Sequence, residues 1–343
     1  MADRSAESKE ISPGLNLEQV AAKWEGVLES DPKDVEALVQ LSLCYGRMRR
    51  SDDALTAARR AVALAPEVAS GHRALGVELF LQDENEDAEE ELRRAIELDP
   101  ESSAARFPLA QLLADQGDWD GADAMLAAAR DLVGEDRAGL AQGWYVEAYI
   151  NLAGKELDAA EECIREALEY EDANPRIAAL AYANLGNVQA RRRQFADGIG
   201  NLETALGLNP YLRSASKLLG QLYLLRKRYS DALAPLLDAS QDPRLASPVM
   251  EYSLGLAYAK TGDAERSRAH YQEALDSGLT GYYALAARMA LIWSRSGVRW
   301  LVYLAGACLA VWLAVTRVPT PAIAVLIALV VGYAVYRWWA GRS

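Results

Sequence analysis

The chain has 343 residues and a formal net charge of −13, which is long enough for two or three domains or for one extended architecture without a central core. Its acidity argues against non-specific nucleic-acid binding, which needs a basic face to displace counterions from phosphates. The three cysteines lie far apart without a CxxC pair, so they predict neither a zinc site nor a disulfide framework and favour a reducing compartment.

The first segment of the chain, residues 1–14, is polar, charged and rich in Ser. It lacks the apolar run of a secretory signal, and its composition predicts a short disordered N-terminus. The following stretch, residues 15–32, predicts a single helix that covers the exposed apolar face of the next helical pair.

A period near 34 residues organises most of the chain. Pro32, Pro66 and Pro100 follow one another at intervals of 34, and a fixed period of this size is typical of repeat architectures. Longer gaps at 133–142 and 170–178 predict lengthened helices or turns there. With those gaps allowed for, repeats are expected to begin at Val35, Ala69, Ser103, Ala141, Ala179, Arg213 and Pro248.

Particular places within the repeat hold the same kind of residue in every copy. The eighth and twentieth places hold only small residues, and the twenty-seventh is always Ala. Small side chains allow two antiparallel helices to cross closely, so the pattern predicts helical hairpins. Leu fills the seventh place in all but one copy, where Glu147 replaces it. The eighth-place residues are Ser42, Gly76, Ala110, Ala148, Gly186, Gly220 and Gly255.

Two short motifs connect this pattern with a known family. LGQLY (219–223) and LGLAY (254–258) match L-G-x-x-Y, and the segments 88–92 and 122–126 match A-x-x-x-F with an aliphatic residue in the aromatic position. The chain therefore resembles the tetratricopeptide repeat (TPR) family. The resemblance implies an all-α fold, a TPR-type α-solenoid over residues 15–279 with about seven repeats and an N-terminal half repeat.

The resemblance also implies where a partner would bind. In this family the first helix of each hairpin lines a concave surface that takes peptide segments. Amides there can pair with a peptide backbone and aromatic rings can hold its side chains. The alternative, that the aromatic residues pack between hairpins, stays open. The expected groove residues are Arg73, Phe80, Phe107, Gln111, Tyr145, Tyr149, Asn184, Asn187, Lys217, Gln221 and Tyr252.

One specialised version of that surface is not expected. Some family members hold the C-terminal carboxylate of heat-shock chaperones with Lys and Asn on one repeat and Lys and Arg on the third. Asn187 and Lys217 are present in matching places, but Ala183, Val249 and Ser253 occupy the others. The resemblance therefore predicts no chaperone-adaptor clamp.

Basic residues recur at the turns of two successive repeats. They would stack into a ridge able to contact anionic lipid or an acidic partner, although ordinary solvated turns are an open alternative. The ridge residues are Arg191, Arg192, Arg193, Arg226, Lys227, Arg228 and Lys260.

Nothing in the sequence points to catalysis. The two histidines, His72 and His270, have no partner at metal-ligand spacing, and no phosphate-binding glycine loop is present. Carboxylate runs such as 83–91 fall on a helix start and an outer face, as in solvated surfaces. The chain is therefore predicted to be no enzyme, to hold no metal or cofactor, and to bind no nucleic acid.

The C-terminal region changes character. Residues 280–297 predict a capping or connecting helix, and 298–343 predict a transmembrane helical hairpin with spans 300–316 and 319–336, uncharged and flanked by tryptophans. The alternative is a pair of buried core helices. Arginines outside the spans outnumber the one in the turn by four to one, which predicts that the TPR domain and both termini are cytoplasmic. Small residues for helix packing are Gly306, Ala310, Ala314, Ala324, Ala328 and Gly332.

These features together predict a membrane-anchored protein-protein interaction scaffold at a bacterial inner membrane. It would bind partner segments in its groove and hold them at the cytoplasmic face, for assembly or regulation of a membrane complex. The alternative is a constitutive accessory subunit that docks through the hairpin. Its partners would be peptide segments, integral membrane subunits, or both.

Overall fold

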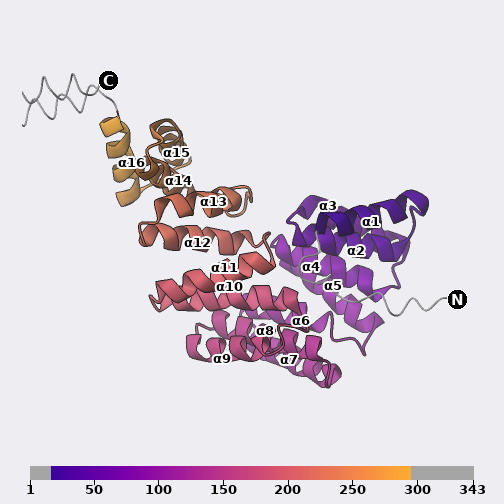
Figure 1. Cartoon of the computed structure of the whole chain (residues 1–343). Helices are drawn as coiled ribbons and strands as arrows, with labels where there is room; N and C mark the ends of the chain where they lie inside the picture. The colour runs from indigo at the N-terminus through magenta and orange to yellow at the C-terminus, as the bar shows by residue number, and fades with distance from the viewer. Residues whose placement is uncertain (1–16, 295–343) are drawn as a thin grey trace, which may run out of the picture. The chain divides into compact units, whose positions relative to one another are not determined.

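The computed structural model describes residues 17–294, over which the chain forms sixteen α-helices and no strand (Figure 1). The helices fall into two units, of which the first ends at Leu245 and the second begins at Ala246. The second unit contains α14 (Pro248–Thr261), α15 (Ala264–Asp276) and α16 (Gly281–Ser294). The first unit contains α1 (Leu17–Ser30), α2 (Val35–Arg47), α3 (Ser51–Leu64), α4 (Ala69–Leu81), α5 (Asn85–Leu98), α6 (Arg106–Gln116), α7 (Trp119–Val133), α8 (Arg137–Ala153), α9 (Leu157–Leu168), α10 (Pro175–Arg191), α11 (Phe195–Leu208), α12 (Arg213–Leu225) and α13 (Tyr229–Ser240).

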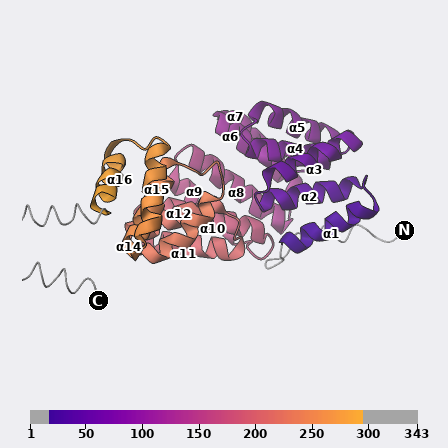
Figure 2. The same cartoon turned by 90° about the horizontal axis from the view of Figure 1, so that it is seen from above.

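In the first unit, α1 packs on α2 and is followed by six antiparallel hairpins, α2–α3 to α12–α13 (Figures 1 and 2). In the second unit, α14 and α15 form a seventh hairpin and α16 packs on α15. The all-α solenoid of TPR type predicted from the sequence is thereby confirmed for the described residues.

The repeat frame agrees with the helix starts in most hairpins. Four helices begin at the predicted residues Val35, Ala69, Arg213 and Pro248. The predicted lengthening is also confirmed, because α8 and α10 each have 17 residues and begin four residues before the frame predicts. Their new first turns are stabilised by N-caps, in which Asp136 accepts hydrogen bonds from the amides of residues 138 and 139 and Asn174 accepts one from that of residue 177.

The helices of a hairpin cross closely at the eighth place. A Cβ atom on Gly76 would lie 2.7 Å from Cγ of Leu92, and one on Gly220 would lie 2.6 Å from Cγ of Leu236. Both leucines are fully buried. The contact distances confirm that small residues permit the crossing, as the sequence pattern predicts.

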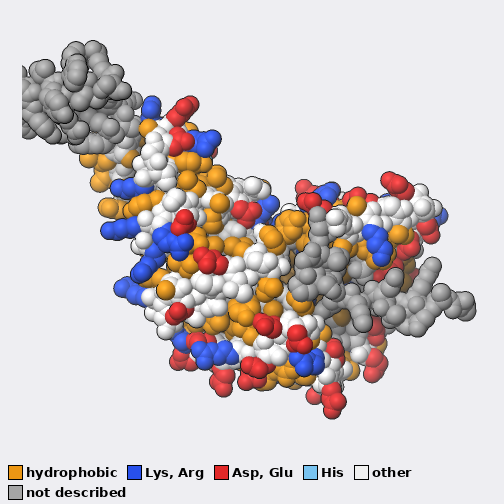
Figure 3. Space-filling model, in the orientation of Figure 1, with side chains coloured by type: hydrophobic (Ala, Val, Ile, Leu, Met, Phe, Trp, Pro, Cys, Tyr) orange, Lys and Arg blue, Asp and Glu red, His pale blue; other side chains and the backbone are white. Residues whose placement is uncertain are grey.

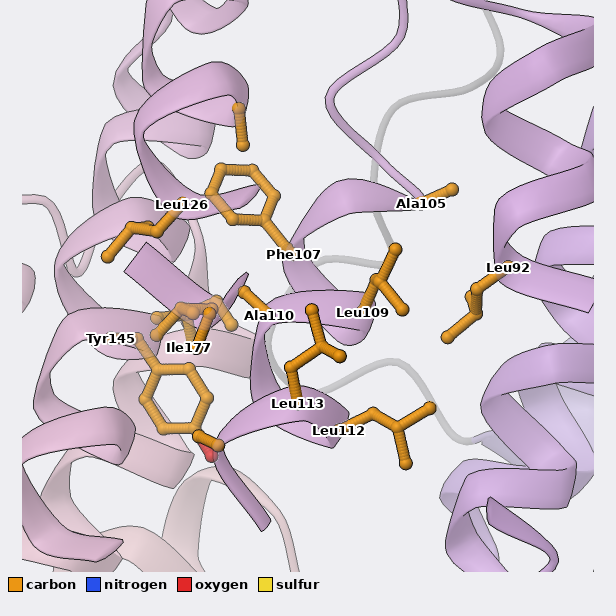
Figure 4. Packing of buried hydrophobic residues seen from close by; sticks show 14 of the residues in the cluster. Leu92, Ala105, Phe107, Leu109, Ala110, Leu112, Leu113, Leu126, Tyr145 and Ile177 are labelled. Carbon is orange, nitrogen blue, oxygen red and sulfur yellow. The ribbon is translucent and has the colours of Figure 1, made fainter. Parts of the chain in front are cut away.

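A continuous core runs through the hairpins of the first unit. Figure 4 shows Leu109 and Leu112 of α6 directed towards Leu92 of α5, while Phe107 lies beside Leu126 of α7. Successive hairpins therefore share one core, and each needs its neighbours to bury its apolar face. 

The interruption of the Leu row by Glu147 has a local explanation. Arg130 of α7 donates a hydrogen bond to the Glu147 carboxylate, and its guanidinium lies 4.5 Å from the ring centroid of Trp144. The carboxylate is therefore paired, and the packing contact expected of Leu is replaced by an ion pair with a stacked arginine.

All seven hairpins turn in the same way. The residue at the fifteenth place has a positive φ in every repeat, and the next amide bonds back across the turn, as from Glu156 N to Asn151 O at 2.8 Å. This is the Schellman arrangement that ends many helices. The residues with positive φ are Arg49, Asp83, Gly117, Lys155, Arg193, Lys227 and Gly262.

The predicted localisation is wrong as far as the described residues can show it, since no helix within 17–294 is long and apolar enough to cross a membrane. The longest, α8 and α10, have 17 residues, whereas a span takes about 20 apolar ones, and their apolar faces pack in the core. The described helices therefore contradict the prediction of a multi-pass inner-membrane protein. The hairpin predicted at 300–316 and 319–336, with its small-residue positions, lies outside the described residues.

Candidate binding surface

The first unit closes on itself. Tyr211, in the connection between α11 and α12, packs against the N-terminal cluster that includes Leu17 and Met48. In addition, Arg244, after α13, donates a hydrogen bond to the carbonyl oxygen of Leu81 at the end of α4. These segments are far apart in the sequence, so the hairpins of the first unit curve round until its two ends meet.

Charged side chains also contact one another where the two ends of the first unit meet. Arg49 lies 3.5 Å and Arg244 3.2 Å from Oδ2 of Asp242, and Glu78 of α4 is 3% exposed beside them. We call Arg49, Glu78, Leu81, Asp242 and Arg244 the closure contact. Its two carboxylates, those of Glu78 and Asp242, are each 3% exposed, so they interact with the arginines at a lower effective dielectric constant than in water.

The two carboxylates of the closure contact differ in their titration. Burial favours protonation of Asp242, but hydrogen bonds from Arg244 and the charges of Arg244 and Arg49 outweigh it, and the pKa of Asp242 stays below its ordinary value. At Glu78 burial dominates over the same two arginines and raises the pKa to about 7. Glu78 is thus the group here that changes charge near neutral pH.

The first helices of successive hairpins contact one another, as α6 does with α8 and α8 with α10, and we call the side that they form the inner face of this curved unit. Near its middle lies Tyr145 of α8, which is 9% exposed and whose hydroxyl is hydrogen-bonded by Gln111 of α6 and Asn184 of α10. Burial raises the pKa of Tyr145, while those amides and the charge of Arg176 oppose the rise. Three predicted groove residues from three hairpins are therefore brought together.

Two arginines accompany this tyrosine. Arg73 of α4 and Arg176 of α10 are half-buried, and they come within electrostatic reach although their hairpins are not neighbours. Burial lowers the pKa of Arg73, the charge of Arg176 lowers it further, and Glu36 partly offsets both. Arg176 is positioned by a hydrogen bond of 3.3 Å from its Nη2 to Oε1 of Gln142.

Tyr149 lies one helical turn beyond Tyr145. Its hydroxyl donates to the carboxylate of Asp115 on α6, at 2.9 and 2.8 Å from the two oxygens. Burial and this carboxylate raise the pKa of Tyr149, so the ring is neutral and joins α8 to α6.

The remaining predicted residues of the first unit divide into two groups. Phe107 is 2% exposed and Phe80 packs against the core cluster, so the packing alternative describes both. Asn187 and Gln221 are half-buried, and Lys217 donates to the carbonyl oxygen of Leu245 at 3.4 Å. The polar members are thus half-buried, whereas the phenylalanines pack in the core.

Tyr252 belongs to the second unit, where its ring lies 5.5 Å from that of Tyr271 and 5.1 Å from that of Tyr283. Aromatic rings at these separations stabilise each other. Tyr252 therefore helps to join α14 to α15 and α16, and burial raises its pKa.

The basic turns of α10–α11 and α12–α13 lie on one edge, where Figure 3 shows Lys and Arg side chains gathered. Arg192 pairs with Asp158 and Glu161, and Arg228 pairs with Asp231 at 2.6 Å. The exposed side chains there are Arg191, Arg193, Arg226 and Lys227, while Lys260 is exposed in the second unit.

Two residues escaped the sequence analysis. Arg176 lies in the lengthened start of α10, before the first place of the repeat. The assignment of groove residues by their place in the repeat therefore could not include it. Glu78 did leave a signal, because its place is apolar in the other six repeats: Cys44, Leu112, Ile150, Val188, Leu222 and Ala257. Within residues 17–294, no group of His, Cys, Asp and Glu could hold a metal ion.

Family comparisons agree with the helical hairpins. Three family models, all described as tetratricopeptide repeat, match residues 40–103 and 183–246, 79–141, and 252–277. Together they cover more than half of the chain. Among curated protein sequences, none is significantly similar to it.

Solved structures share the fold at low sequence identity. A chain of the APC/C hetero-tetramer Cut9-Hcn1 superposes with a TM-score of 0.57 at 17% identity, over 82% of this chain and 53% of that one. Pseudomonas aeruginosa PilF superposes with a TM-score of 0.53 at 18% identity, over 64% of this chain and 96% of that one. The chain thus spans about half the length of the first structure.

At such identities the superpositions establish the fold alone. The family matches add the repeat type, and the TPR fold is typical of protein-interaction scaffolds. The chain is a tetratricopeptide-repeat protein.

Proposed function

We propose that this protein is an interaction scaffold that binds a polypeptide segment of a partner on the inner face of its first unit. The observation that carries the proposal is the convergence of Gln111, Tyr145 and Asn184 with the two arginines Arg73 and Arg176. Gln111, Tyr145 and Asn184 come from the neighbouring helices α6, α8 and α10, whereas Arg73 of α4 and Arg176 of α10 belong to hairpins that are not neighbours.

Their chemistry suits recognition of a peptide. Amides and a tyrosine hydroxyl can hydrogen-bond to a main chain, and arginines are prominent in binding hot spots. A surface needed only for packing would not keep arginines half-buried, because charged groups are costly to desolvate without a partner. By holding such a segment, the protein would act as an adaptor in the assembly or regulation of a complex.

A second function is favoured by the second unit. Helix α16 exposes Tyr282, at 76%, together with Leu285 and Met289. Contiguous apolar side chains of this kind mark contact surfaces in many proteins. Permanent packing of this helix against another subunit would make the protein a constitutive component of a complex.

Site-specific photo-crosslinking separates the two functions. The full chain is expressed in its own cells with p-benzoylphenylalanine at Tyr149 on the inner face, at Trp119 on α7, or at Tyr282 on α16. Trp119 is the matched control, since it is an exposed aromatic residue on an outer helix. Crosslinked proteins are identified by mass spectrometry.

The scaffold function predicts a recurrent crosslink from position 149 that is absent from position 119. Crosslinks from position 282 alone would instead support the function of a constitutive subunit. Equal labelling from all three positions would contradict both functions.

A further inference from the structure

We propose that α16 pairs in parallel with the α16 of a second copy of this chain, and that the protein is therefore a dimer. The inference concerns the apolar surface of the second unit and does not rest on the scaffold function of the inner face. Three features of α16 support it: the spacing of its exposed side chains, their concentration on this one helix, and the position of its charge.

The exposed apolar side chains of α16 have the spacing of a coiled-coil contact. They follow one another at intervals of three, four and three residues, which are the a and d positions of two heptads and lie along one side of a helix. Their exposed fractions are 76%, 60%, 57% and 48% in chain order. We call these residues the α16 seam: Tyr282, Leu285, Met289 and Ile292.

The opposite side of α16 is occupied by its own unit. Ala284 and Ala287 are buried in a cluster with Tyr271 of α15, and the ring of Tyr283 lies 5.1 Å from that of Tyr252 on α14. Figures 1 and 2 show α14 and α15 on one side of α16 and no other described helix of the second unit on its far side. The α16 seam therefore faces away from the hairpin on which the helix packs.

Such a concentration of apolar side chains occurs on no other described helix. Of the twelve large apolar side chains exposed within residues 17–294, five belong to α16 and no other helix has more than two. Helix α16 follows the seventh hairpin, in the place where an array of repeats ordinarily has a polar outer face. An apolar seam in this place indicates a contact surface.

The charge of α16 favours a second copy as the partner. Arg288 is the one charged residue of the helix, so the α16 seam lacks the flanking charges that usually select a different helix. In a parallel pair the two Arg288 side chains lie on opposite sides of the seam, whereas in an antiparallel pair they lie on the same side and repel each other. A parallel pair also places each seam residue opposite itself, and this two-fold contact closes after two chains.

The size of the seam indicates how strong the pair is. Burial of the seam side chains of two copies removes on the order of 1,000 Å² from water, which is at the lower end of specific interfaces. The dimer is therefore expected to dissociate on dilution. While it persists it carries two inner faces, and a partner with two binding segments would be held more tightly through effective concentration.

The test uses the full chain with single cysteine substitutions. Leu285→Cys and Met289→Cys are oxidised separately and as a mixture, with tags of different size, and the disulfide-linked dimers are separated on non-reducing gels. Leu225→Cys is the matched control, since Leu225 is 64% exposed on α12. The wild type gives the background from the three native cysteines.

We expect each seam variant to form at least ten-fold more disulfide-linked dimer than Leu225→Cys or the wild type. In the mixture, dimers of one variant with itself should exceed mixed dimers several-fold, because parallel pairing places each position opposite itself. Copurification of two differently tagged copies should fall at least ten-fold when both carry Leu285→Glu and Met289→Glu, and Leu225→Glu should leave it unchanged. Circular dichroism checks that each variant is folded.

Dimer yields equal to those of the controls, an excess of mixed dimers, or unchanged copurification of the Glu variant would overturn the inference. Its failure is distinguishable from failure of the proposed function. If position 282 crosslinks to another protein while the seam variants form no disulfide, α16 binds a different subunit. The scaffold function is decided separately, by the crosslinks from position 149.

Discussion

At the scale of single residues, the hairpin turns are the first feature that affects stability. Five of the seven turns place a residue other than Gly at positive φ, a conformation that costs an L-residue about 1–2 kcal/mol. Lys155 is one of them, with a φ of 68° and an exposed side chain. Strain is therefore present at a site where the side chain contributes no recorded contact.

Replacing Lys155 by Gly should raise the free energy of unfolding by about 0.5–1 kcal/mol, because Gly adopts this conformation without strain. Urea denaturation of the full chain measures the change. Lys33→Gly is the control, since Lys33 is an exposed turn residue without positive φ, and it should be neutral or slightly destabilising. Equal effects at both positions would show that the turn is not strained.

Glu78 is the second residue with a measurable signature. Its pKa of about 7 lies above the ordinary 4.5, so between these values the folded state binds more protons than the unfolded state. Its contribution to stability therefore falls as the pH rises from about 4.5 to 7. The charged groups that face it are Arg49 and Arg244, with Asp242 and Arg213 next to Arg49.

Glu78→Gln should consequently be more stable than the wild type at pH 8, by about 1–3 kcal/mol, and the difference should vanish near pH 4, below the ordinary pKa. Denaturant titrations at both pH values measure it. Glu97→Gln, at an exposed ion pair on α5, should show no such pH-dependent difference. A less stable Glu78→Gln protein at pH 8 would mean that the charged carboxylate stabilises the closure contact.

At the scale of helices, the eighth place determines how closely a hairpin packs. A Cβ on Gly220 of α12 would meet Leu236 of α13 at 2.6 Å, whereas a Cβ on Gly207 of α11 would meet nothing within 4 Å. The same substitution should therefore have opposite effects at two glycines in neighbouring helices.

Gly220→Ala should destabilise the protein by about 1–2 kcal/mol, because buried Leu236 must move in a close-packed core. Gly207→Ala should stabilise it by about 0.5–1 kcal/mol through helix propensity. Thermal unfolding of the two variants gives the comparison. Stabilisation by both would show that the helices can separate without loss of packing.

At the scale of the whole first unit, the closure contact joins hairpins that are far apart in the sequence. Solenoid repeats ordinarily contact only their neighbours. Here Arg244 bridges Asp242 and the carbonyl oxygen of Leu81, so the last hairpin of the unit holds the end of α4. Removing this arginine should loosen both ends at once.

Hydrogen exchange followed by mass spectrometry should show exchange about ten-fold faster around residues 79–82 in Arg244→Ala, equivalent to a loss of about 1–2 kcal/mol of local protection. Arg93→Ala should leave these amides unchanged, because its ion pair with Glu89 lies within α5. Unaltered exchange in the Arg244 variant would mean that Tyr211 and its apolar contacts hold the closure without the charges.

The sequence by itself determined the repeat, because close crossing of two helices requires a small residue such as Gly220 and leaves a periodic trace. It also predicted the lengthened α8 and α10 from breaks in the period. It could not separate Phe107 from Tyr145, because both are aromatic residues at the same repeat place. Both lie in the core cluster, but Tyr145 also forms hydrogen bonds with Gln111 and Asn184 through its hydroxyl. The assignment of groove residues by their place in the repeat also missed Arg176, which lies in an insertion.

The tertiary structure alone decided how the polar residues combine. Arg73 and Arg176 are 103 positions apart in the sequence, and the pairing of Arg49 with Asp242 spans an even longer stretch. Such contacts depend on the accumulated rotation between successive hairpins, in which small differences in packing add up along the solenoid. A repeat pattern specifies each hairpin and its neighbour, but not the curvature that brings distant hairpins face to face.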